Sequence, residues 1–345
     1  MAGIWMILTG LLLLFSAESM QAAYQAAQVF AKCVLPALFP MMIVGSLLGE
    51  FLPSSASRTG QTLIQILFGF CAGSPASARQ LTALDHRQPL PADTYRFLLC
   101  ASGVMSPMFF TGTLANKLNS RVAWLLLVSH WLGALATGFF PLCLSHFRKP
   151  IALHPEAPQT LSPNRMPFFR LLTSAIENAA HAQLSILGAM MVFSIIAALF
   201  RTLLAHLFPV WTSAHSPWLA VAWALMEIGG GALAVIDAFP TTPLWLLCAL
   251  CSFGGLSIWL QNLLFLDGKQ HPAKLLAWRL LHGMLSGLIC SFVLRWSGIS
   301  AWTETVPTLS PLWGRHALAP LHVNPLPLSV LLILAARPWR DPSFP

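Results

Sequence analysis

Two interruptions of apolar stretches are the places where this sequence predicts chemistry most directly. Gly73-Ser74-Pro75 interrupts residues 61–84, and a segment that begins with Glu227 and continues through three glycines interrupts residues 217–239. Within a membrane, a broken helix leaves backbone N–H and C=O groups that must be buried or must line a polar cavity. Free helix N-termini attract polar or anionic ligands, and free C-termini attract cations. The pair predicts a ligand site; close helix packing through small residues is the alternative.

Glu227 is the most informative single side chain, because ionisable groups inside a span are costly and mark functional sites. The alternative is a neutral carboxyl group that is hydrogen-bonded to a neighbouring helix. His130 and His282 occupy matched positions in the two halves of the chain, where hydrogen bonding between helices is favoured over a proton relay. Glu177 and Asp237 lie nearer to the ends of predicted spans, where they can face lipid headgroups.

Small residues are also predicted to interrupt one further helix in each half of the chain. They could serve either close helix packing or contact with a substrate. They are Ser102, Gly103, Ser106 and Pro107 in the first half, and Ser252, Gly254, Gly255 and Ser257 in the second. The candidate substrate-binding residues are therefore Gly73, Ser74, Pro75, Ser102, Ser106, Glu227, Gly229, Gly230, Ser252, Gly254, Gly255 and Ser257.

Composition identifies the class of protein that must position these residues. Of 345 residues, 56% are apolar and 9% are charged, whereas soluble domains carry roughly a quarter charged residues. The sequence therefore predicts a multi-span membrane protein in contact with the lipid bilayer. The net charge of +8 fits basic cytoplasmic loops, without a nucleic-acid partner.

The polar residues of the predicted spans are too few for enzyme chemistry. The seven cysteines lie in apolar stretches, and the single C-x-x-C, Cys248 and Cys251, has no second pair or histidine cluster to complete a metal site. No nucleophile, base and acid occur together. We expect neither an enzyme nor a metal site, and no cofactor apart from a possible coupling Na⁺ or H⁺.

The chain divides into many apolar segments and one long polar loop. Residues 19–33 are amphipathic and predict a helix at the membrane interface, and the run at 326–336 is too short to assign as a span. The predicted apolar helices are 3–17 (an uncleaved first span), 34–52, 61–84, 94–115, 121–147, 171–207, 217–239, 243–265 and 273–296.

The two halves of the sequence resemble each other. "LCASGVMSPMFF" (Leu99 to Phe110) resembles "LCALCSFGGLSIW" (Leu247 to Trp259), and "AWLLLVSHWLGAL" from Ala123 resembles "AWRLLHGMLSGL" from Ala277. The separation stays near 150 residues, which indicates an internal duplication. The predicted division is residues 1–26 (first span and start of the interfacial helix), 27–147 (repeat 1), 148–170 (cytoplasmic proline-rich linker), 171–296 (repeat 2) and 297–345 (C-terminal tail).

The orientation of the repeats follows from the interruptions. Half-helices of about ten residues are roughly 15 Å long, which reaches the middle of a bilayer and no farther. Each interrupted segment is then a re-entrant hairpin, each repeat crosses the membrane an odd number of times, and the second repeat is inverted. This topology, with a cytoplasmic N-terminus, leaves Lys32, Lys117, Arg121, Arg201 and Arg295 outside. It puts eleven other basic residues inside, namely Arg58, Arg79, Arg87, Arg96, Arg148, Lys149, Arg165, Arg170, Lys269, Lys274 and Arg279.

Four motifs over about residues 30–296 resemble those of the YlbJ-type sporulation integral membrane proteins, whose shared module is the nucleoside-recognition or Gate domain. "GFCAGSPASARQLTAL" is similar to that family's "SGYP-x-GA" segment, with Ser74 where the family has tyrosine. "LCASGVMSPMFF" is similar to "FCNNAGP", "MEIGGGAL" to "LEIT-x-G", and "SFGGLSIWLQ" to "SFGGLSVHLQ". The order of elements is also similar to that of concentrative nucleoside transporters, although the first hairpin lacks their Gln and Glu.

The resemblance implies an all-α fold of two inverted repeats, each with a re-entrant hairpin and a broken transmembrane helix. It implies that Ser74, Glu227, Ser252 and Ser257 face the substrate. The leading hypothesis is a bacterial cell-membrane protein, associated with sporulation, that transports or senses a small polar, nucleoside-like solute, possibly as a homo-oligomer. The alternative is a structural or assembly factor of the spore envelope that does not transport.

Overall fold

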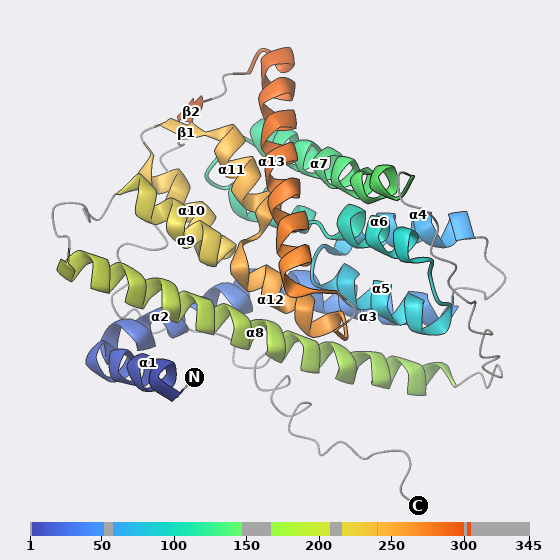
Figure 1. Cartoon of the computed structure of the whole chain (residues 1–345), viewed down its shortest axis with the longest axis horizontal. Helices are drawn as coiled ribbons and strands as arrows, with labels where there is room; N and C mark the ends of the chain where they lie inside the picture. The colour runs from blue at the N-terminus through green and yellow to red at the C-terminus, as the bar shows by residue number, and fades with distance from the viewer. Residues whose placement is uncertain are drawn as a thin grey trace, which may run out of the picture.

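The structure, a computed structural model, describes residues 2–51, 58–146, 167–207, 216–239, 241–268, 270–299 and 302–304 (Figure 1). Most of the predicted linker 148–170, and the predicted tail beyond residue 304 with its run at 326–336, lie outside the described residues.

The described residues are almost entirely helical. The elements of the first half are α1 (Ala2–Leu14), α2 (Ser16–Val29), the π-helix η1 (Phe30–Val34), α3 (Leu35–Phe51), α4 (Arg58–Ala72), α5 (Ala76–Arg87), α6 (Ala92–Ser102), the π-helix η2 (Phe109–Leu114) and α7 (Ser120–His146). Those of the second half are α8 (Phe168–Leu207), α9 (Pro217–Met226), α10 (Ile228–Ala238), β1 (Thr241–Pro243), α11 (Leu244–Phe253), α12 (Gly255–Phe265), α13 (Pro272–Ser297) and β2 (Trp302–Glu304).

Five helical segments of the described chain are long and apolar enough to cross a membrane, so the chain is a helical membrane protein. They are Ser16–Leu48, Ser120–Pro141, Phe168–Leu207, Leu244–Phe265 and Pro272–Ser297. The longest of them, α8, runs across the whole width of the molecule in Figure 1.

Helix α13 has an apolar exposed face and a more polar buried face. Its most exposed apolar side chains recur every four residues: Leu280, Met284, Leu288, Phe292 and Trp296 are between 48% and 85% exposed. Its buried face instead carries polar and small residues, among them Arg279, His282 and Ser286. An apolar exterior around a more polar interior is the arrangement that lipid favours, because helices associate there through packing and hydrogen bonds.

Both predicted interruptions are confirmed as helix breaks. Gly73, with a φ of +75°, and a cis Ser74–Pro75 peptide bond separate α4 from α5. Glu227 separates α9 from α10 because its extended backbone (φ −139°, ψ 114°) ends one helix and begins the next. Each pair of helices is called a hairpin below: the first hairpin is α4–α5 and the second is α9–α10.

The helix after each hairpin is also broken, as predicted. α6 ends at Ser102, residues 103–106 are not helical, and the chain resumes a helical path that leads into η2. α11 ends at Gly254, whose left-handed backbone (φ 80°, ψ 0°) separates it from α12. We refer to these two places as the first break and the second break.

The N-terminal region differs from the prediction. Residues 19–33 do not form a separate interfacial helix, because α2, η1 and α3 follow one another as one helical run within the candidate span Ser16–Leu48. The π-turn η1 lies directly before Pro36 and Pro40, where the normal helical hydrogen bonds are lost. A widened turn keeps the helix going where the sequence suggested an end.

Polar contacts join the two halves at opposite ends of the α11–α12 segment. Beside the end of α12, His86 Nε2 lies 2.9 Å from an Asp267 carboxylate oxygen, and Thr82 donates to the carbonyl of Phe265. Before the start of α11, Lys117 Nζ lies 2.5 and 2.6 Å from the two carboxylate oxygens of Asp237. Asp237, predicted to face headgroups, is therefore in an ion pair. The base of the first hairpin lies at one end, and the base of the second hairpin lies at the other.

A short β-ladder adds to the predicted all-α fold. Thr241–Pro243 pairs antiparallel with Trp302–Glu304, which brings the chain after α13 back to the start of α11 (Figure 1).

Candidate functional site

The tip of the first hairpin packs against the first break. The N–H of Ser74 donates to the carbonyl of Val104 (2.5 Å), and a Cβ added to Gly73 would lie 2.5 Å from the backbone nitrogen of Ser106. The hydroxyl of Ser74 is buried without a hydrogen-bond partner among the described residues, and Pro75 is the N-cap residue directly before α5. The predicted residues of this region are therefore brought together.

Behind this tip, Ser102 is held by internal hydrogen bonds. Its hydroxyl donates to the carbonyl of Leu98 (2.7 Å) and accepts from Nε2 of Gln65 (3.2 Å), and the same Gln65 nitrogen donates to the carbonyl of Ser77. Gln65 thus connects α4, α5 and α6, although the sequence did not single it out.

The tip of the second hairpin packs against the second break in the same way. A Cβ on Gly255 would lie 3.1 Å from the carbonyl oxygens of Ala224 and Met226, at the end of α9. Ser257, three residues past the break, is buried and accepts a hydrogen bond from Nε2 of Gln261 (3.1 Å).

Glu227 caps the helix that it begins. Its two carboxylate oxygens accept hydrogen bonds from the N–H groups of Gly229 (2.6 Å) and Gly230 (2.7 Å), and the residue is 5% exposed. The positive end of the α10 dipole favours a carboxylate here. Because each oxygen accepts one of these bonds and has a further lone pair, the group can accept another donor.

His130 connects the first break to the second. Its Nε2 accepts a hydrogen bond from the backbone N–H of Met105 (2.8 Å), and its Nδ1 lies 2.7 Å from the hydroxyl of Ser252. His282 donates from Nε2 to the carbonyl of His130 (3.1 Å), and the two rings stack with centroids 4.8 Å apart. Since Nε2 of His130 is an acceptor, its ring is neutral with the proton on Nδ1. This geometry fits hydrogen bonding between helices.

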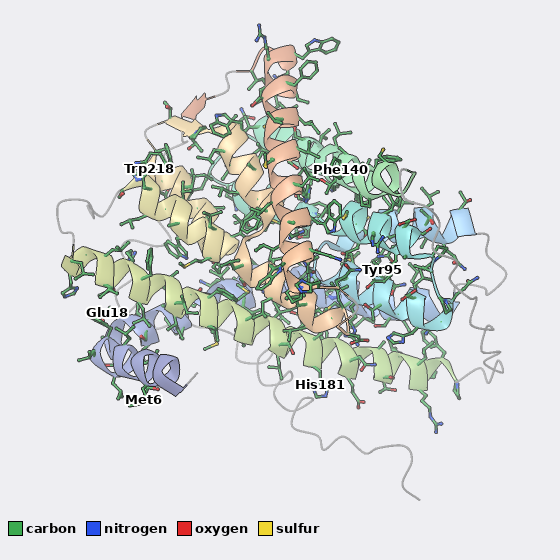
Figure 2. The ribbon with its side chains drawn as sticks, viewed as in Figure 1. Met6, Glu18, Tyr95, Phe140, His181 and Trp218 are labelled. Atoms are coloured by element: carbon green, nitrogen blue, oxygen red, sulfur yellow. The ribbon has the colours of Figure 1, made fainter. Side chains whose placement is uncertain are left out.

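A cavity of about 410 Å³ lies between α2, α8 and the second hairpin. Its lining includes the buried residues Ala26, Ser194, Glu227 and Gly230. Other lining residues are exposed and form its mouth: Glu18 and Gln21 on α2 and Arg201 on α8. Figure 2 shows Glu18 on α2, below the left part of α8.

Gly230 allows two polar groups of the cavity to lie close to each other. A Cβ added there would lie 3.0 Å from Cζ2 of Trp223 and 3.3 Å from a carboxylate oxygen of Glu227. The indole N–H of Trp223 is buried without a partner among the described residues, and the guanidinium carbon of Arg201 lies 6.0 Å from the centroid of the Trp223 ring. The cavity lining therefore includes a carboxylate acceptor and a cation, together with a tryptophan whose covered indole N–H is an unsatisfied donor.

Only part of the predicted site lines this cavity. Glu227 and Gly230 do, whereas Gly229 and the predicted residues of the first tip and of both breaks do not. Glu18, Arg201 and Trp223 were not predicted as site residues. The sequence did draw attention to Arg201, because it is a charged residue near the end of an apolar stretch. From the sequence alone, however, it was assigned to the outer side of the membrane.

Arg279 is the largest departure from the expected placement of charge. It was counted among the cytoplasmic charges, but it is 5% exposed and lies at both breaks, where Nη1 donates to the carbonyl of Gly103 and Nη2 packs against Gly254. Its signal in the sequence was an arginine inside the predicted span 273–296.

In comparisons with known proteins, no protein-family model, no curated protein and no solved structure matches the chain.

Proposed function

We propose that the chain is a membrane protein with a transporter-like core, and that it binds a small polar solute in the cavity that Glu227 helps to line. The observation that carries this proposal is a buried carboxylate with spare acceptor capacity at a helix break, facing a cavity of about 410 Å³. Small-molecule sites commonly measure about 300–1,000 Å³ and combine an apolar lining with a few convergent polar groups.

The polar groups of the cavity favour a solute with both donors and acceptors. A donor on the solute would bind Glu227, and an acceptor would bind the indole N–H of Trp223. The exposed Glu18 and Arg201 at the mouth carry opposite charges, which favours a neutral or zwitterionic solute over one with a large net charge. The nucleoside-like solute suggested by the family resemblance belongs to this class.

The arrangement of the hairpins supports an inverted duplication. Each half has the same order of a long helical run, a hairpin, a broken helix and a long helix. The two hairpins have their bases at opposite ends of the α11–α12 segment, as inverted repeats require. Hairpins and broken helices in inverted repeats are typical of solute sites in transporters. A bacterial cell-membrane location, a cytoplasmic N-terminus and a link to sporulation are proposed on the resemblance and the charge distribution.

Ligand-induced stabilisation of the purified protein tests the binding site. In detergent, the thermal midpoint is measured with a panel of ribonucleosides, amino acids and sugars, and any hit is followed by uptake into proteoliposomes. A ligand present at 100 times its Kd stabilises by about 2.7 kcal/mol. We expect Glu227→Gln and Trp223→Phe to reduce this stabilisation. Glu227→Gln replaces an acceptor oxygen with a donor in nearly the same shape, and Trp223→Phe removes the indole N–H while keeping an aromatic ring.

Glu177→Gln is the matched control, since it makes the same change on α8 outside the cavity lining, and it should leave binding intact. A ligand whose binding is unchanged in both Glu227→Gln and Trp223→Phe would place the site elsewhere. If no panel member stabilises or enters the proteoliposomes, while a strain with Glu227→Gln keeps full function, the scaffold alternative is favoured.

A further inference from the structure

The guanidinium of Arg279 is a buried charge between the ends of two broken helices. Nη1 donates to the carbonyl of Gly103, the residue that follows the end of α6, and Nη2 would be 2.5 Å from a Cβ on Gly254, the residue that ends α11. Arg279 is seven residues past Pro272, about 10 Å along α13 at 1.5 Å per residue. The charge is therefore held within the body of the molecule.

No carboxylate pairs with this charge in the part of the chain that the structure describes. Ion pairs elsewhere in the described residues join His86 to Asp267, Arg96 to Asp93 and Lys117 to Asp237. The neighbouring His130 is neutral, as its hydrogen bonds show, and the Nε of Arg279 is buried without a hydrogen-bond partner among the described residues. A buried cation without compensation is strongly unfavourable, so other groups must supply negative charge.

Backbone carbonyls supply part of it. A helix end carries roughly half an elementary charge, negative at the C-terminus, and the C-terminal end of α6 meets this guanidinium through the carbonyl of Gly103. At Gly254 the C-terminus of α11 adjoins the N-terminus of α12, so the two helix-end charges at the second break largely offset each other. In broken-helix transporters, such carbonyl ends coordinate a bound cation.

We propose that Arg279 is a resident cation: its guanidinium occupies the cation site formed by the two breaks and holds them together without a bound metal ion. The side chain reaches both breaks from α13, and Nη2 lies so close to Gly254 that a Cβ on that residue would clash with it. The proposal does not depend on which solute enters the cavity beside Glu227.

The thermal midpoint of the purified protein tests this directly. For the wild type, we expect the same midpoint in sodium chloride and in choline chloride, because the site is already filled. Arg279→Ala should lower the midpoint, and low-millimolar guanidinium chloride should restore part of the loss, whereas urea, which has a similar shape without the charge, should not. Leu280→Ala, on the exposed face of α13, is the control that should not respond to guanidinium.

Two further variants keep the proposal testable if Arg279→Ala does not fold. Arg279→Lys keeps the charge and should fold with an intermediate midpoint, whereas Arg279→Met, which keeps the length without the charge, should be less stable than Arg279→Lys or should not fold. A wild-type midpoint that falls when sodium is removed, Arg279→Met as stable as the wild type, or equal rescue of Arg279→Ala by urea and guanidinium would each overturn the proposal.

Discussion

At the scale of single residues, His130 shows how a buried polar side chain can join two helix breaks. Its ring accepts from the N–H of Met105 at the first break and hydrogen-bonds Ser252 before the second. In lipid, such bonds between helices stabilise association because the alternative is an unpaired polar group. The role of His130 in this structure is therefore to hold the two broken helices in register.

We expect His130→Ala to lower the free energy of unfolding by about 1–3 kcal/mol, because it leaves the buried N–H of Met105 without an acceptor. Ser252→Ala should cost less, since it removes only one end of one hydrogen bond. The double variant should be less destabilised than the sum of the single variants, with a coupling of about 0.5–3 kcal/mol. Denaturant unfolding in detergent micelles measures all three.

His181→Ala is the control for this cycle. His181 is exposed on α8 (Figure 2), and its loss should leave the unfolding free energy nearly unchanged. Full additivity of His130→Ala and Ser252→Ala would show that the two side chains are not coupled.

At the scale of elements, the tip of the first hairpin depends on backbone shape more than on side-chain chemistry. Gly73 combines a φ of +75° with close contact to the backbone at Ser106. Only glycine meets both requirements without strain. The glycine that predicted the helix break from the sequence is therefore also the residue that makes the break possible in the structure.

Gly73→Ala should destabilise the protein by about 1–2 kcal/mol through the backbone angle alone, and more through the displacement of the first break. Gly188→Ala is the matched control, because Gly188 lies within α8 with nothing within 4 Å of an added Cβ. There alanine should be neutral or stabilising by up to about 1 kcal/mol. Thermal midpoints compare the two variants, and equal effects would contradict a role for the tip geometry.

The helix breaks could be predicted from the sequence, whereas the cavity could not. Glycine, proline and ionisable residues inside an apolar stretch indicate an interruption of the helix. The sequence therefore predicted helix breaks at residues 73–75 and at Glu227. The cavity depends on α2, which the sequence assigned to the membrane surface because Ala and Gln dominate it. Its continuity with α3 depends on a π-turn before two prolines, which composition does not reveal.

At the scale of the whole molecule, charge counting assigned Arg279 to the cytoplasmic side, whereas the structure buries it between the helices. Each charge was assigned to a side of the membrane by its position in the sequence. That rule fails for a buried arginine on a helix that contacts two breaks far away in the sequence. The contact from Arg279 to Gly103 spans 176 residues, so nothing local in the sequence indicates it. The pairing of Lys117 with Asp237 was missed for the same reason.

We expect the two ends of the molecule to lie on opposite sides of the membrane. Single cysteines at the exposed positions Ser120, near Lys117, and His271, near Asp267, report these ends. In a background that lacks the exposed cysteines Cys33, Cys71 and Cys143, a membrane-impermeant maleimide should label Ser120→Cys in intact cells and His271→Cys only after permeabilisation. Labelling of both positions in intact cells would contradict the inverted arrangement.

The close crossing of α7 and α13 has a consequence for how this molecule can change shape. Gly133 lies so close to Ser286 that no side chain fits between them, while the residues one turn away from Gly133 on α7, Ser129 and Thr137, are larger. Sliding either helix along the other would drive Ser286 into one of them. The two helices that carry His130, His282 and Arg279 therefore resist sliding past each other, and opening of the proposed solute path would have to involve the hairpins instead.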